Sequence, residues 1–291
     1  MTHPTVSIII PTYNDWSRLS LCLQKLSNQS YSVDKYEIIV VNNSPQDSVP
    51  DKFVCPANCV ILAEEKPGSY AARNKALSVA KGEIIGFTDS DCVPDLDWIK
   101  NAVDFLQSNK ELSRVGGPLK IFSKYNKPSK VELYDTLFAF PQKNYVNGGI
   151  AVTGNMYTYR HIFDEVGLFD ENTLSGGDYE WGLRAQAKGF NIGYAENVIV
   201  NHPARDSLKE LIKKAKRVGS GQANFMEPKK GFYNWIRGLM FLYRPKTWEI
   251  KDIFTRGKHL SFLDKLWLVF LRHYLLWTSD ISRKAAQKKK N

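Results

Sequence analysis

The chain has 291 residues, of which 43% are hydrophobic and 24% are charged. This length is enough to bury a full core, and the composition is that of an ordinary globular protein rather than a disordered one. Its four cysteines are too few and too scattered for a disulfide framework or for a zinc site with two Cys/His pairs. The first residues lack the basic and apolar regions of a signal peptide, so we expect a reduced, cytoplasmic protein.

The formal net charge of +10 is distributed unevenly along the chain. Residues 1–203 hold 19 Lys and Arg against 23 Asp and Glu, whereas residues 204–291 hold 21 against 7. A basic C-terminal third predicts a partner that is rich in phosphate, either nucleic acid or anionic lipid.

Short β-branched runs alternate with helical periodicity through the first part of the chain. The patterns predict strands at 6–10, 37–41, 60–63 and 83–88, and helices at 15–28, 69–80 and 95–107. This alternating order indicates an α/β fold with a mostly parallel sheet flanked by helices. Because ligands of such sheets bind beyond the carboxyl ends of the strands, the polar segments 11–14, 42–44 and 89–91 are candidate site residues.

The middle of the chain is less regular. Strands are expected near 115–121 and 150–159, a helix at 176–188, and strands at 191–194 and 198–201. Beyond residue 204, a basic helix is predicted at 208–217, and the segments 231–243 and 260–277 combine apolar and aromatic residues with basic ones.

The triplet Asp89-Ser90-Asp91 directly follows the apolar run 84–87. Two carboxylates one residue apart at a strand end are suited to a hard cation that takes the rest of its ligands from a diphosphate, such as Mg²⁺ or Mn²⁺. Such a triplet also occurs by chance in solvated turns, so the motifs around it decide its interpretation.

Five further motifs accompany this triplet. They are Val6-Ser-Ile-Ile-Ile-Pro-Thr-Tyr-Asn14, Ile38-Ile-Val-Val-Asn-Asn-Ser44, Gly68-Ser-Tyr-Ala-Ala-Arg-Asn74, Gly154-Asn155 and Gly176-Gly-Asp-Tyr-Glu-Trp-Gly-Leu-Arg184. In this order and at these spacings the chain resembles glycosyltransferase family 2 over residues 5–203. The resemblance implies the GT-A fold and an inverting transfer of a sugar from a nucleotide diphosphate to an acceptor hydroxyl.

The resemblance also implies a domain division. We expect a catalytic domain at 1–204, which binds the nucleotide sugar mainly through residues 1–92 and the acceptor through 93–204. A basic, amphipathic helical extension is expected at 205–291.

Residues after the first two strands resemble the nucleotide contacts of the family. Asn42 stands where the family usually has Asp, and its side-chain oxygen can still accept a hydrogen bond from a uracil N–H. A uridine donor is therefore expected first and a thymidine donor next. Arg73 resembles the family residue that offsets diphosphate charge, although an arginine on a helix is also commonly solvated. The implied nucleotide-binding set is Pro11, Thr12, Tyr13, Asn14, Asn42, Asn43, Arg73, Asp89 and Ser90.

The metal is expected to be Mn²⁺ or Mg²⁺, with Asp91 as the direct ligand. His202 resembles a histidine that completes the metal site in many relatives, and imidazole suits Mn²⁺ better than Mg²⁺. A lone histidine is otherwise more often structural.

Asp178 resembles the aspartate of a Glu-Asp catalytic pair, with Gly177 in the place of Glu, and is the candidate general base. Without the resemblance it would be interpreted as a helix-capping aspartate, with Glu180 and Arg184 as surface partners. Trp181 lies on the same face of the helix and is suited either to stack on a sugar or to pack in the core. The residues expected around the donor and acceptor sugars are Gly154, Asn155, Gly177, Tyr179, Glu180 and Trp181.

The C-terminal third suggests a membrane surface. In 260–277, the side chains of Leu263, Leu266, Trp267, Phe270, Leu271 and Tyr274 fall on one helical face, and the apolar run 266–271 is far too short to span a bilayer. Apolar aromatic faces with basic flanks are typical of helices that lie in the membrane interface. We therefore expect peripheral attachment at the cytoplasmic face and a saccharide or lipid-linked acceptor; packing on the catalytic domain or a dimer interface is the alternative.

Two other functions fit single features. A sugar nucleotidyltransferase also uses a nucleotide-binding α/β sheet, but it needs a Gly-rich basic loop after the first strand, where this chain has Pro-Thr-Tyr-Asn. A nucleic-acid-binding protein would explain the basic tail, but no zinc finger, RNP-type motif or helix-turn-helix accompanies it. The predicted function is thus glycosyl transfer in polysaccharide or glycoconjugate synthesis, without a nucleic-acid partner.

Overall fold

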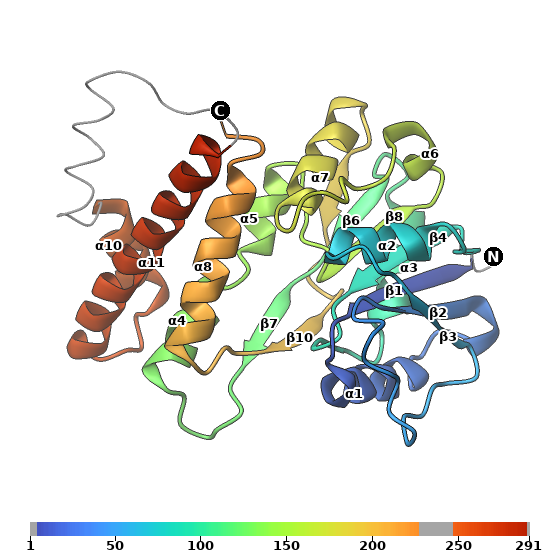
Figure 1. Cartoon of the computed structure of the whole chain (residues 1–291), viewed down its shortest axis with the longest axis horizontal. Helices are drawn as coiled ribbons and strands as arrows, with labels where there is room; N and C mark the ends of the chain where they lie inside the picture. Colours follow the sequence, from blue (N-terminus) through green and yellow to red (C-terminus); the bar gives the residue numbers. More distant parts are fainter. Residues whose placement is uncertain (1–4, 227–246, 290–291) are drawn as a thin grey trace. The chain divides into compact units, whose positions relative to one another are not determined.

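The computed structural model describes residues 5–226 and 247–289, which form two compact units (Figure 1). The first unit contains the residues up to Lys120 together with Phe140–Pro203. The second contains Ile121–Ala139 and the described residues from Ala204 onward. The aromatic segment predicted at 231–243 lies outside the described residues. The division into a catalytic domain and an extension at residue 204 stays a prediction.

The first unit is built on a seven-stranded sheet in the order β3-β2-β1-β4-β8-β6-β9. The first four of these strands are parallel, and β8 runs antiparallel to both β4 and β6. This arrangement confirms the predicted α/β fold with a mostly parallel sheet. The strand bounds are β1 Val6–Thr12, β2 Tyr36–Asn42, β3 Cys59–Ala63, β4 Ile84–Thr88, β6 Arg114–Gly116, β8 Asn155–Tyr159 and β9 Ile192–Tyr194.

Alternating strand side chains supply two separate cores, because successive residues of a strand point to opposite faces. Ile8 and Ile10 pack with α1 (Trp16–Ser27) and α3 (Trp98–Ser108). Ile9 packs on the other face with α2 (Ser69–Leu77), α6 (Ile162–Val166) and α7 (Gly177–Ala187). Figure 1 shows α1 and α2 on opposite sides of β1. The β-branched runs are therefore buried on both faces, as expected for a parallel sheet covered by helices.

The predicted strand at 115–121 is two strands, because Gly117 and Pro118 interrupt it. β6 ends at Gly116 in the large sheet, and β7 (Leu119–Phe122) belongs to a second, three-stranded sheet in the order β5-β10-β7. β5 is Val93–Pro94 and β10 is Val200–Pro203. The short α5 (Gln142–Asn147) lies in the part that the periodicity left unassigned.

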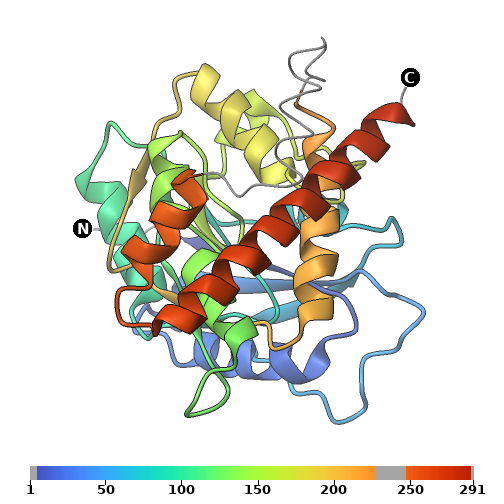
Figure 2. The same cartoon turned by 90° about the vertical axis from the view of Figure 1, so that its left-hand side faces the viewer.

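The second unit consists mainly of helices: α4 (Lys130–Phe138), α8 (Leu208–Gln222), α10 (Thr247–Arg256) and α11 (Phe262–Lys288). The basic helix and the apolar segment predicted here correspond to α8 and α11, and both are longer than predicted. Ser207 and Ser261 begin these two helices by accepting hydrogen bonds from backbone N–H groups of the first turn. Figure 2 shows α11 (red) lying across α8 (orange). No helix in the described part of the chain is long and apolar enough to cross a membrane.

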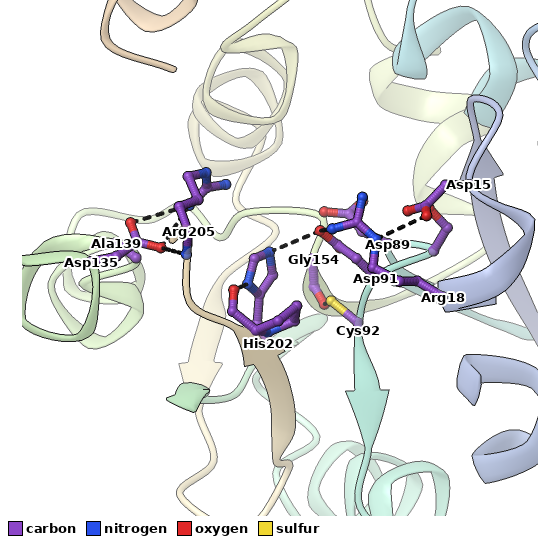
Figure 3. A network of polar contacts seen from close by, with 12 residues as sticks. Asp15, Arg18, Asp89, Asp91, Cys92, Asp135, Ala139, Gly154, His202 and Arg205 are labelled. Atoms are coloured by element: carbon purple, nitrogen blue, oxygen red, sulfur yellow. Dashed lines mark hydrogen bonds and ion pairs between the residues drawn. The ribbon is translucent and has the colours of Figure 1, made fainter. Parts of the chain in front are cut away.

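A buried carboxylate ties the second unit together. Asp135 on α4 is 1% exposed and accepts hydrogen bonds from both the backbone N–H and the guanidinium of Arg205 (Figure 3). Lys214 on α8 donates to the carbonyl of Ala139, which caps the C-terminal end of α4. A buried carboxylate needs such donors because its desolvation is otherwise uncompensated.

Gly117 should tolerate no side chain. A Cβ at this position would lie 1.8 Å from the backbone oxygen of Val198, which cannot move without disturbing the turn before β10. We expect Gly117→Ala to lower the free energy of unfolding by about 3 kcal/mol, at the upper end for overpacking. The control is Gly189→Ala, where φ is +87° but no atom lies within 4 Å, and where the backbone alone should cost about 1 kcal/mol. Urea denaturation measures both; equal losses would contradict the close approach.

Candidate active site

The order of the strands places two polar loops side by side. From β1 the chain continues to β2 and β3 on one side and then returns to β4 on the other side of β1. Ligands bind at such a reversal, beyond the carboxyl ends of the strands. The loop after β1 carries Tyr13, which is 71% exposed, and Asn14, whose φ of 52° turns the chain into α1. The loop after β4 carries Asp89 and Asp91.

Asp89 is held by a buried arginine. Its Oδ1 accepts a hydrogen bond of 2.6 Å from Nη2 of Arg73, whose side chain is 3% exposed. Arg73 is therefore buried rather than solvated, and its charge is directed at Asp89; its contact with the diphosphate stays a prediction. The carboxylate remains 38% exposed, so it is fixed from behind and open in front.

Asp91 faces a histidine that comes near the end of the first unit in the sequence. Its Oδ2 lies 3.4 Å from Nε2 of His202 on β10 (Figure 3). The same oxygen lies 3.6 Å from Nη1 of Arg18 on α1, and Arg18 also donates to Asp15 at 2.8 Å. The imidazole is almost completely buried, with Phe140 packed against it at a ring distance of 5.1 Å.

The hydrogen bonds of His202 determine what its inner nitrogen offers. Nδ1 lies 2.7 Å from the Pro203 carbonyl, which can only accept, so Nδ1 carries the hydrogen. In the neutral ring Nε2 then has a lone pair, and it faces a carboxylate oxygen that also has lone pairs. Two such atoms at 3.4 Å need a proton or a cation between them.

The third side chain near the two aspartates contributes no charge. Asp89, Asp91 and Cys92 have potential ligand atoms within 4.8 Å of one another. Burial, and next the charges of Asp89 and Asp91, raise the pKa of Cys92 far above the usual thiol value, so it stays a thiol. The oxygens of the two aspartates and His202 Nε2 are therefore the atoms suited to a hard or borderline cation.

The two asparagines after β2 are largely engaged within the protein. The Asn43 amide donates to the carbonyls of Glu64 and Lys66, and its oxygen accepts from Gly68 N–H. Asn42 accepts from the Ser44 backbone and donates to the Asp47 carbonyl. Asn43 thus joins the end of β2 to the loop before α2, a shaping role that the motif alone did not reveal.

Asp178 lies in the first turn of α7, at the start of the helix as predicted, and Gly176 before it has the left-handed conformation. Its Oδ1 accepts from the Tyr70 hydroxyl at 3.0 Å and from the Tyr179 backbone at 2.9 Å. Its Oδ2 lies 3.3 Å from the Thr153 backbone nitrogen. The carboxylate is accordingly oriented by three donors from three segments.

The structure corrects two of the expected sugar contacts. Trp181 is fully buried, stacks on Phe163 at 4.6 Å and donates its indole N–H to the Gly167 carbonyl, so it packs in the core and does not stack on a sugar. Asn155 is also fully buried; it accepts from Trp98 and donates to two backbone carbonyls. Both side chains support the sheet.

The remaining predicted residues lie around the same edge. Pro11 and Thr12 are buried at the end of β1, and Ser90 donates to Asp15 at 3.3 Å. Gly154 offers its carbonyl to Thr88, and a Cβ there would contact Asp89 at 3.4 Å. Tyr179 is 39% exposed beside Asp178, while Glu180 forms an i,i+4 ion pair with Arg184. Gly177 packs against the Tyr70 ring.

Sequence reasoning missed Asp15, Arg18, Tyr70 and Thr153. Asp15 and Arg18 lie one turn apart at the start of α1, directly after β1, so the rule on strand ends could have selected them. Tyr70 lies one turn before Arg73 in a motif that was already singled out. Thr153 contributes only its backbone, which no side-chain pattern reveals.

Comparison with known proteins identifies the family. The sequence model described as glycosyl transferase family 2 matches residues 7–167. The chain is 35% identical over 227 residues to glycosyltransferase AglE of Haloferax volcanii, covering 76% of this chain and 74% of that protein. This chain belongs to glycosyltransferase family 2. It is accordingly a glycosyltransferase, an enzyme of glycoconjugate biosynthesis.

Other members of the family and solved structures are similar over most of the chain. A dolichyl N-acetyl-α-D-glucosaminyl phosphate 3-β-D-2,3-diacetamido-2,3-dideoxy-β-D-glucuronosyltransferase of Methanococcus voltae is 26% identical, covering 82% of this chain and 79% of that protein. The mannosyltransferase PcManGT from Pyrobaculum calidifontis, in complex with GDP-Man and Mn²⁺, superposes with a TM-score of 0.60 at 18% identity. The superposition covers all of this chain and 89% of PcManGT. The similarity shows that this chain has the GT-A fold.

The pairing of Arg73 with Asp89 should matter for stability. Asp89→Asn leaves the buried guanidinium without its carboxylate, and we expect the free energy of unfolding to fall by about 2 kcal/mol, the size of a hydrogen bond to a charged group. The control is Glu171→Gln, which removes an ion pair to Lys66 whose side chains are 46% and 40% exposed and should change stability by under about 0.5 kcal/mol. Urea denaturation compares the two variants. Equal losses of stability would contradict a larger contribution from the buried pair.

Proposed function

We propose that this enzyme transfers a sugar from a nucleoside diphosphate donor to a hydroxyl of a saccharide or lipid-linked saccharide, with inversion at the anomeric carbon. The observation that carries the proposal is that α2 holds both halves of the site. Its Arg73 fixes Asp89 beside Asp91, and its Tyr70, one turn earlier, holds Asp178. A donor site and a separate carboxylate base are the two parts that an inverting transfer needs.

Asp91 and His202 would hold Mn²⁺ or Mg²⁺, with Asp89 beside the ribose or in the outer part of the metal site. Asp91 Oδ2 and His202 Nε2 lie 3.4 Å apart and could both bind one cation, and the imidazole favours Mn²⁺. A bound divalent cation supplies positive charge next to the diphosphate leaving group. Asp15, Asp89 and Asp91 face two guanidinium groups, those of Arg18 and Arg73, so the site has an excess of negative charge to offset.

Asp178 is proposed as the general base. The acceptor oxygen forms a bond to the anomeric carbon as the bond to the diphosphate breaks, and the diphosphate leaves with the electron pair. The proton of the acceptor hydroxyl passes to Asp178. It lies in the first turn of α7, near the positive end of the helix dipole.

The donor is proposed to be a UDP-sugar, with a dTDP-sugar next. The loops Pro11–Asn14 and Asn42–Asn43 would contact the base and ribose, with Tyr13 exposed for contact with the nucleotide. S. aureus TarS 1–349, in complex with UDP-GlcNAc, superposes with a TM-score of 0.55 at 15% identity, and covers 98% of this chain and 92% of the TarS chain. PcManGT holds GDP-Man and Mn²⁺. Both structures support a nucleotide-sugar donor. The identity of its nucleobase is tested by the nucleotide-binding experiment below.

A lipid-linked acceptor fits the second unit. The name of the Methanococcus voltae relative specifies a dolichyl phosphate acceptor. Helix α11 has two apolar faces: Leu268, Leu271 and Leu275 pack inside the unit, while an exposed stripe remains on the other side. The stripe consists of Leu263, Leu266, Phe270, Tyr274 and Ile281, at spacings of three, four or seven residues.

This stripe continues into Lys284 and Lys288, both exposed. We propose that it lies in an anionic membrane surface at the cytoplasmic face, with the apolar residues in the interface and the lysines near the lipid phosphates. A second copy of the chain is a less suitable occupant, because it would bring the same positive charges.

Nucleotide binding tests the catalytic proposal. UDP with Mn²⁺ should stabilise the protein by about 2.7 kcal/mol at a hundred times its dissociation constant. The shift should shrink without Mn²⁺ and disappear in Asp91→Ala, while dTDP, GDP and CDP give smaller shifts. Asp97→Ala, at the start of α3, is the matched carboxylate control. A shift that is independent of Mn²⁺ or of Asp91 would contradict the metal site.

Vesicle binding tests the membrane proposal. Leu263→Glu/Phe270→Glu replaces two side chains that are 73% and 70% exposed, and should weaken binding to phosphatidylglycerol vesicles at low salt at least tenfold. Val54→Glu/Leu96→Glu makes the same charge change at exposed positions of the other unit and should bind normally. Vesicle sedimentation measures both. If the first variant still binds vesicles, the face is not the membrane contact; if it instead turns a dimer into a monomer, the face joins two copies.

A further inference from the structure

The two oxygens of Asp178 are held unequally. Oδ1 accepts two hydrogen bonds, from the Tyr70 hydroxyl at 3.0 Å and from the Tyr179 backbone at 2.9 Å. Among the described residues, Oδ2 accepts one long hydrogen bond, from the Thr153 backbone at 3.3 Å. An oxygen with two good donors is a poor proton acceptor, because its lone pairs are engaged. Oδ2 is therefore the atom more available to an acceptor hydroxyl.

Tyr70 is a permanent donor in this pair. Its side chain is 5% exposed, and its ring packs on Phe169 at 5.6 Å. Burial, and next the charge of Asp178, raise the pKa of Tyr70 far above its usual value, which favours the protonated hydroxyl. It therefore stays a donor whenever Asp178 is a carboxylate.

The position of the Tyr70 ring depends on Gly177. A Cβ at residue 177 would lie 2.9 Å from two ring carbons of Tyr70, closer than real Cβ contacts. The ring of Tyr70 thus occupies the space that any side chain at 177 would need. Tyr70 can therefore reach Asp178 because residue 177 is a glycine.

Helix α2 itself is fixed at both sides of this contact. Arg73, one turn after Tyr70, is bonded to Asp89. Asn74 donates to the Phe169 carbonyl at 2.9 Å and accepts from the Phe169 N–H at 3.1 Å, which ties α2 to the segment before α7. Tyr70 is consequently presented to Asp178 from a rigid support.

We propose that Tyr70 is a positioning residue of the transfer reaction. By anchoring Oδ1 of Asp178, in a space that Gly177 leaves open, it orients Oδ2 toward the acceptor hydroxyl whose proton Oδ2 takes. This inference rests on the proposed role of Asp178 as the general base.

The test compares Tyr70→Phe with the unchanged enzyme. Turnover is followed as nucleoside diphosphate release, with water as acceptor, from UDP-glucose, UDP-N-acetylglucosamine, dTDP-glucose and GDP-mannose. We expect kcat to fall roughly tenfold to a hundredfold, the effect of a misplaced catalytic group, with the KM for the donor and the stabilisation by nucleotide and Mn²⁺ unchanged. The matched control is Tyr145→Phe. Burial, and next the charge of Asp178, raise the pKa of Tyr145, so this hydroxyl lies in the same surroundings. Among the described contacts, however, it has no hydrogen bond to Asp178.

A second variant perturbs the same contact from its other side. Gly177→Ala should displace the Tyr70 ring and lower kcat, and in the Tyr70→Phe background it should have little further effect. This non-additivity is the signature of a shared contact. Independent effects of the two changes would overturn the proposed link between Gly177 and Tyr70.

Asp178→Asn, measured in parallel, separates this inference from the proposed function. Full activity of Asp178→Asn would remove the base assignment itself. An inactive Asp178→Asn together with a fully active Tyr70→Phe would keep Asp178 as the base and overturn the role of Tyr70. The role of Tyr70 would also be overturned if Tyr70→Phe lost stability and nucleotide binding in proportion to its loss of kcat. A crystal structure of Tyr70→Phe gives a readout without turnover: the Asp178 carboxylate should turn from its position, and an unmoved carboxylate would contradict the proposal.

Discussion

The buried ion pair between Arg73 and Asp89 is the constraint on which the site depends. A guanidinium that is 3% exposed must keep a carboxylate partner, since an unpaired charge at such a depth is costly. The pair therefore fixes the end of β4 against α2 and determines which carboxylate oxygens face outward. Because α2 also carries Tyr70, the same helix sets the position of Asp178.

The two ends of the site differ in how their charges are compensated. Around Asp91, carboxylates outnumber guanidinium groups, and a buried imidazole nitrogen lies 3.4 Å from a carboxylate oxygen. Around Asp178, neutral donors from a hydroxyl and two backbone groups hold a single carboxylate. The first arrangement has three carboxylates to two guanidinium groups, whereas the second carboxylate is held by neutral donors alone. This difference underlies the proposed division into a cation-assisted leaving group and a separate base.

The helical unit follows a different logic from the sheet. Helix α11 uses Leu271 and Leu275 to pack against Leu211 of α8, yet keeps large side chains such as Phe270 exposed on its other side. A helix that is apolar on two faces is normally covered on both. The fold of this unit accounts for one face, and the other, which ends in lysines, is the face proposed to contact anionic lipid.

The sequence by itself determined the α/β fold, the position of most strands and helices in the first unit and the segments that meet at the site. Those features depend on local patterns: β-branched runs, helical periodicity and polar residues after strands. The tertiary structure decided the roles of individual side chains. Trp181 packs in the core, Arg73 acts through Asp89, and His202 meets Asp91, because each outcome depends on the register and packing of segments far apart in the chain. The family resemblance pointed to Asp91 and His202 as one site, but local patterns do not specify such contacts, which only the folded chain brings together.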